Sequence, residues 1–190
     1  MTYSGDEIPA LWVLVPFLIV SVVAMVRRLR RRGAATPARV ATGLLTCAYA
    51  AAVLDTVLLP YPVGPKHPDT DVPWHVWVNL VPFASDDLYG MWLNLLLFVP
   101  LGFLLPLLSA GISAPRVAVA GFLVSLSVEV VQLVGDLTVS NGRVFDVDDL
   151  LPNTLGTVVG YAIFRGVTLI PVVRRLLAAC TWPARPRVGR

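Results

Sequence analysis

The sequence predicts an all-α membrane protein, a polytopic transmembrane helix bundle of about five spans with its N-terminus outside and its C-terminus in the cytoplasm. Three observations lead to this fold class. Of the 190 residues, 56% are hydrophobic and only 14% are charged, which is too little charge to cover the surface of a soluble domain of this size. The apolar residues form long blocks, and the basic residues collect between alternate blocks.

Four apolar runs without basic residues predict the first four spans, because each run is long enough to cross about 30 Å of hydrocarbon. They cover residues 8–26, 40–59, 91–110 and 117–135. A fifth run, residues 150–173, is apolar except for Asn153, several threonines and Arg165. Acidic residues precede the first run and five arginines follow it, the reverse of a cleavable leader, so we expect an uncleaved first helix.

The charges predict how these spans are oriented, because Lys and Arg in short loops collect on the cytoplasmic side of a membrane. With the N-terminus outside, every arginine except Arg143 falls inside or at the inner end of a helix. We therefore expect a multi-pass protein of the cell membrane. The same arginines are expected to contact membrane lipids, and we expect no nucleic-acid partner.

This orientation divides the chain into three parts. Residues 1–60 hold two N-terminal spans joined by a basic cytoplasmic loop. Residues 61–173 hold an outer interfacial loop followed by three spans, and residues 174–190 form a basic cytoplasmic tail.

Several polar side chains lie within the predicted spans, where such groups are costly and mark a functional site by default. Ser125, Glu129 and Gln132 follow the spacing i, i+4, i+7 and share one face of the fourth span. Asn94 lies one turn into the third span, and Asn153 opens the fifth. The polar face of the fourth span should point into the bundle, either as a hydrogen-bonded contact between helices or as a functional site.

The densest polar stretch separates the fourth and fifth spans, where Arg143 precedes Asp146, Asp148 and Asp149. These residues are expected either to cap the fifth helix and order the loop, or to bind a headgroup or a cation. No fixed ligand loop is present, so we expect neither a metal nor a cofactor. Together with Asp55 and the polar residues of the spans, they predict a cavity open to the outer leaflet.

Four motifs occur in order between about residues 61 and 165: NLVPF at 79–83, NLLLFVPLG at 94–102, SVEVVQ at 127–132 and GRVFDVDDLLPNTLG at 142–156. In these motifs the chain resembles the VanZ-like family of bacterial integral membrane proteins, which is associated with teicoplanin resistance. The resemblance implies a membrane fold and a family site whose polar positions fall on Asn79, Asn94, Glu129, Gln132, Arg143, Asp146, Asp149 and Asn153.

Three functions fit this pattern, and the residues favour a non-enzymatic protein of the cell envelope. Such a protein would bind a glycopeptide-type or lipid-type amphiphile, or a cell-wall precursor, at the outer leaflet, and would lower glycopeptide susceptibility. The alternative is an intramembrane enzyme acting on a lipid or precursor headgroup, with Glu129 or Asp146 as general acid or base and Arg143 on an anionic group. A transporter ranks third, because no internal repeat is present. Gly156 and Gly160 have GxxxG spacing, which predicts close helix packing and a homo-oligomer.

Overall fold

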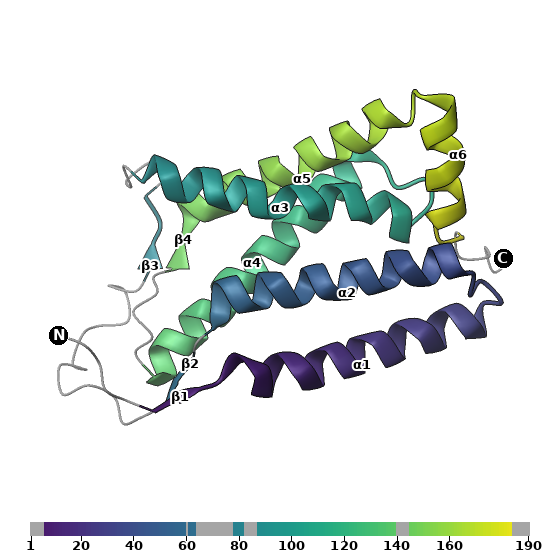
Figure 1. Cartoon of the computed structure of the whole chain (residues 1–190). Helices are drawn as coiled ribbons and strands as arrows, with labels where there is room; N and C mark the ends of the chain where they lie inside the picture. Colours follow the sequence, from purple (N-terminus) through teal and green to yellow (C-terminus); the bar gives the residue numbers. More distant parts are fainter. Residues whose placement is uncertain (1–5, 60, 64–77, 82–86, 140–144, 184–190) are drawn as a thin grey trace, which may run out of the picture.

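A computed structural model describes residues 6–59, 61–63, 78–81, 87–139 and 145–183. Long helices run between two ends of the bundle, with the short strands at one end and the last helix at the other (Figure 1). The all-α prediction is confirmed. In chain order the elements are β1 (Asp6–Ile8), α1 (Ala10–Arg31), α2 (Pro37–Leu58), β2 (Tyr61–Val63), β3 (Val78–Asn79), α3 (Leu88–Leu108), α4 (Ala114–Val139), β4 (Phe145–Asp146), α5 (Val147–Val167) and α6 (Pro171–Cys180).

Four of these helices, α1 to α4, are long and apolar enough to cross a membrane, and the chain is a membrane protein. Helix α5 has a similar length, but its sequence includes Asp148, Asp149, Asn153 and Arg165. These polar residues lower the mean hydropathy of α5. The helix packs mainly against α3 and, to a lesser extent, against α4. The fifth span and the orientation of the bundle stay predictions.

The turn between α1 and α2 is shorter than the sequence predicted, because the arginines after the first apolar run continue the helix to Arg31. Gly33 ends this helix in the left-handed conformation, with φ of 59°, which glycine adopts without steric cost. Thr36 then begins α2, since its side chain accepts a hydrogen bond from the backbone N–H of Arg39 at 3.4 Å. Pro37 occupies the first turn, where its missing N–H is tolerated.

Two prolines, Pro100 and Pro106, lie inside α3 without ending it. A proline removes one backbone donor and crowds the carbonyl groups of the preceding turn. The Tyr49 hydroxyl of α2 donates a hydrogen bond to one carbonyl of that turn, the Leu97 oxygen, at 2.8 Å. A carbonyl of the proline-containing segment thus has a hydrogen-bond donor on a neighbouring helix.

Helices α3 and α5 approach each other through glycines. A Cβ atom on Gly102, Gly156 or Gly160 would overlap a backbone carbonyl of the facing helix. Gly156 meets Leu95 and Gly160 meets Val99, so the GxxxG pair packs within the chain. Both glycines are buried there, and a homo-oligomer, which stays a prediction, would need another surface.

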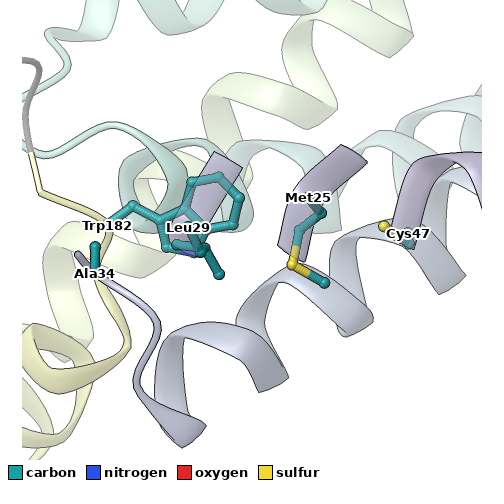
Figure 2. Packing of buried hydrophobic residues seen from close by; sticks show 5 residues of the cluster. All are labelled: Met25, Leu29, Ala34, Cys47 and Trp182. Carbon is teal, nitrogen blue, oxygen red and sulfur yellow. The ribbon is translucent and has the colours of Figure 1, made fainter. Parts of the chain in front are cut away.

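Helix α6 was not predicted, since the sequence assigned most of its residues to a tail. It is followed by Trp182, which is buried in a hydrophobic cluster with Met25, Leu29, Ala34 and Cys47 (Figure 2). The Trp182 indole N–H donates to the carbonyl of Arg39 at 3.1 Å, and its backbone N–H donates to the carbonyl of Leu107 at 2.7 Å. Trp182 therefore attaches the C-terminal segment to the other helices.

The α3–α5 contact predicts a difference between two glycines of the same helix. Gly160→Ala should lower the free energy of unfolding by about 1–3 kcal/mol, because its methyl group would overlap the Val99 carbonyl. Gly166→Ala is the control, since a Cβ there meets no atom within 4 Å. The thermal midpoints of the two purified variants in detergent measure the effect, and equal midpoints would contradict this packing.

Candidate functional site

Most of the predicted polar residues lie on β3, β4 and the helices next to them. These strands lie beside each other at the end of the bundle opposite α6, near the start of α5 (Figure 1). The two strands pair in parallel, with Asn79 opposite Asp146. The Asn79 side-chain amide donates to Asp146 Oδ1 at 3.1 Å. Asn79 Oδ1 accepts a hydrogen bond from the backbone N–H of Val81 at 3.1 Å, so both the nitrogen and the oxygen of the Asn79 amide are hydrogen-bonded.

Asp146 links three parts of this site. Its Oδ1 accepts the backbone N–H of Asp148 at 2.8 Å and so caps the N-terminus of α5. Its own backbone N–H donates to Glu129 Oε2 of α4 at 3.1 Å. One residue therefore connects β3 through its side chain, α4 through its main chain, and the first turn of α5.

The polar face of α4 points into the bundle, as its spacing predicted. Ser125, Glu129 and Gln132 have exposed fractions of 0%, 2% and 8%. The Asn153 side chain of α5 donates to Ser125 Oγ at 2.9 Å, and Thr157 Oγ1 donates to the Asn153 carbonyl at 3.0 Å. Polar contacts therefore extend along the buried surface between α4 and α5.

A side-chain hydrogen bond also joins α3 to α5. The Asn94 side-chain amide donates to Asp149 Oδ1 at 2.6 Å. Asp149 shares the first turn of α5 with Asp148, and Asp146 caps that turn. A hydrogen bond to a carboxylate is stronger than one between neutral groups, so Asn94 stabilises negative charge where several carboxyl groups meet.

Three predicted residues stand apart from this set. Gln132 donates through Nε2 to the Val57 carbonyl of α2 at 3.1 Å, so it joins α2 to α4. Asp55 is exposed in the last part of α2. Arg143 lies outside the described residues, and the predicted contribution of its guanidinium group stays a prediction.

Sequence reasoning left two features of the site undetermined. It named Asp146, Asp148 and Asp149 together as residues that cap the fifth helix or bind a headgroup, and the structure shows that Asp146 is the cap of α5. An aspartate followed by two acidic residues in the first turn is a usable signal for such a cap. It also missed the pairing of Asn79 with Asp146, which no local pattern reveals because 67 residues separate them.

The described site is rich in hydrogen-bond acceptors. Glu129, Asp146, Asp148 and Asp149 supply carboxyl groups, and Asn153 Oδ1 is buried without a hydrogen-bond partner among the described residues. A buried acceptor left unpaired costs about 1–3 kcal/mol. In the part of the chain that the structure describes, no group of three His, Cys, Asp or Glu residues is arranged to hold a metal ion. The arrangement is therefore suited to accept hydrogen bonds from donor groups.

The VanZ/LLP1 family model matches residues 44–171. The chain belongs to this family. The matched region begins in α2, earlier than the motifs of the sequence resemblance, and extends to the first residue of α6. All the site residues described above lie in this VanZ domain, whereas α1 precedes it. No curated protein and no solved structure matches the chain.

The contact between Glu129 and Asp146 predicts different effects for two substitutions. Glu129→Ala removes the acceptor of the half-buried backbone N–H of Asp146, so we expect it to lower the free energy of unfolding by about 1–3 kcal/mol. Glu129→Gln keeps a carbonyl oxygen at that position and should cost less. Thermal unfolding of both purified variants tests this order, and an alanine variant as stable as the glutamine variant would contradict it.

Proposed function

We propose that this VanZ-family membrane protein binds an amphiphile, with the polar headgroup at the carboxylate and amide site and the apolar chain in a neighbouring groove. In the orientation expected from the charges, this site faces the outer leaflet of the cell membrane. Ligands of this kind include a lipoglycopeptide antibiotic of the teicoplanin class and a lipid-linked cell-wall precursor. Binding of the antibiotic would lower the glycopeptide susceptibility of the cell.

The observation that carries this proposal is an apolar groove beside the polar site. Its cavity volume is about 540 Å³, within the range of small-molecule sites. Part of its wall faces outward, with exposed fractions of 63% for Trp92 and 54% for Leu155, whereas Pro152 is buried. The groove is formed by α3 and α5 and is lined by Leu88, Met91, Trp92, Leu95, Leu151, Pro152 and Leu155.

The groove adjoins the polar site through the chain itself. Leu95 follows Asn94 directly, and Leu151 lies two residues after Asp149. The hydrogen bond between Asn94 and Asp149 therefore joins α3 and α5 at the polar end of the groove. An amphiphile needs an apolar wall next to polar groups in this way.

The polar groups favour a headgroup that donates hydrogen bonds. Carboxylates accept hydrogen bonds and attract positive charge, and the side-chain Oδ1 of Asn153 offers a further buried acceptor. Amide and amine groups of a glycopeptide match these acceptors. An anionic precursor headgroup would instead depend on Arg143.

A second candidate function, an intramembrane enzyme, is supported by the burial of Glu129. The residue is 2% exposed, and its carboxyl group accepts a hydrogen bond from the main chain of Asp146. A buried carboxyl group next to a half-buried aspartate is suited to transfer protons, with Glu129 or Asp146 as acid or base. In this alternative, Arg143 would hold an anionic lipid or precursor headgroup.

The groove predicts that a bulky side chain on one wall blocks ligand binding. In a host that expresses the protein, Leu151→Trp should reduce binding of a fluorescent lipoglycopeptide about tenfold, or about 1.4 kcal/mol. Teicoplanin tolerance should fall to that of the host without the protein. Glu129→Gln should also reduce binding, because it replaces one carboxyl oxygen, which can accept a hydrogen bond, with an amide nitrogen that can only donate.

Leu123→Trp is the matched control, because Leu123 of α4 is 53% exposed and lies outside the groove lining. Membrane abundance of each variant is matched by immunoblot. If Leu151→Trp and Leu123→Trp bind and protect equally, the groove is not the ligand site. If the wild type does not bind the antibiotic but changes the headgroups of extracted lipids, the enzyme alternative replaces the binding function.

A further inference from the structure

A separate pocket lies at the other end of the bundle, where α3, α5 and α6 meet. Its cavity volume is about 260 Å³, several times the roughly 30 Å³ that one water molecule occupies in the liquid. Arg165 of α5, Arg174 of α6 and Thr168 between these helices line it. No carboxylate lines this pocket in the part of the chain that the structure describes.

Arg165 is held in position before any ligand arrives. Its Nη1 donates to the Tyr161 hydroxyl at 3.3 Å, and its guanidinium lies 6.0 Å from the centre of the Tyr161 ring. The Tyr161 hydroxyl donates in turn to the carbonyl of Ile112 at 3.3 Å. Such a held guanidinium loses less conformational entropy when it binds an oxyanion.

The surroundings of the pocket are those of a lipid surface. Figure 1 shows α6 crossing the end of the bundle at a steep angle to α2 and α3. Apolar side chains near the start of α6 are exposed, among them Leu169 at 83% and Val172 at 66%. A short helix with exposed apolar residues beside arginines is typical of the membrane interface.

Arginines outside the pocket also lie at this end of the bundle. Four arginines of the α1 terminus line another surface depression. Arg28 is one of them, and its guanidinium lies 5.8 Å from the centre of the Trp182 ring that follows α6. Anionic headgroups accumulate near such clusters, and basic pockets between membrane helices bind them.

We propose that the pocket between α3, α5 and α6 binds the phosphate-bearing headgroup of an anionic phospholipid. Arg165 and Arg174 donate to the phosphate oxygens, while Phe164 and Leu177 of the pocket wall contact the apolar part of the lipid. The apolar wall and the exposed rim favour a lipid over free phosphate. This site is distinct from the amphiphile site and does not depend on the proposed function.

The test is native mass spectrometry of the full-length protein in mild detergent with phosphatidylglycerol or phosphatidylcholine of identical acyl chains. The wild type should prefer phosphatidylglycerol about 30-fold, because each of the two pocket arginines contributes about fivefold. Arg174→Gln should lower its affinity for phosphatidylglycerol about fivefold. Arg175→Gln, the adjacent exposed arginine outside the pocket lining, should leave it unchanged.

A second pair of variants blocks the pocket without changing charge. Ala178 lines the pocket and Ala179 does not, and both are exposed on α6. Ala178→Trp should abolish the phosphatidylglycerol preference, whereas Ala179→Trp should retain it, with thermal midpoints confirming that both variants fold. Equal effects within either pair would overturn the proposal, as would the absence of a preference in the wild type. If inorganic phosphate displaces the lipid and stays bound in its place, the pocket is a site for free anions. That result would also overturn the proposal.

Discussion

The contact between α3 and α5 determines much of the remaining structure. Gly102, Gly156 and Gly160 let the two backbones approach without an intervening side chain. At one end this approach brings Asn94 within 2.6 Å of Asp149 and forms the apolar groove. At the other end the same pair of helices forms two walls of the basic pocket. A single packing solution therefore supports both proposed binding sites.

Asp146 connects three elements of the polar site, which are β3, α4 and α5. Its carboxylate caps α5 and binds Asn79, and its main chain binds Glu129. In an apolar environment each of these groups needs a partner from the protein, because hydrocarbon supplies none. The need to satisfy the polar groups therefore fixes the position of α5 relative to α4 and β3 at the site.

The two ends of the bundle differ in chemistry. The end with β3 and β4 gathers carboxylates and amides, and the end with α6 gathers arginines. This separation agrees with the expected orientation, in which arginines face the cytoplasm. The two proposed sites therefore differ in the ligand they suit. The acidic end suits a ligand that donates hydrogen bonds, and the basic end suits an anion.

The sequence by itself determined the all-α membrane class, the family, and the inward-facing polar side of α4 around Glu129. Each of these depends on local composition or on the spacing of residues within one segment. The tertiary structure alone decided that Asn79 pairs with Asp146, that Gln132 turns to α2, and that Gly156 and Gly160 pack within the chain. It also decided how α6 is attached through Trp182. These contacts join residues far apart in the chain. The sequence does not determine which partner a hydrogen-bonding or apolar group contacts, because that depends on which groups packing brings next to it.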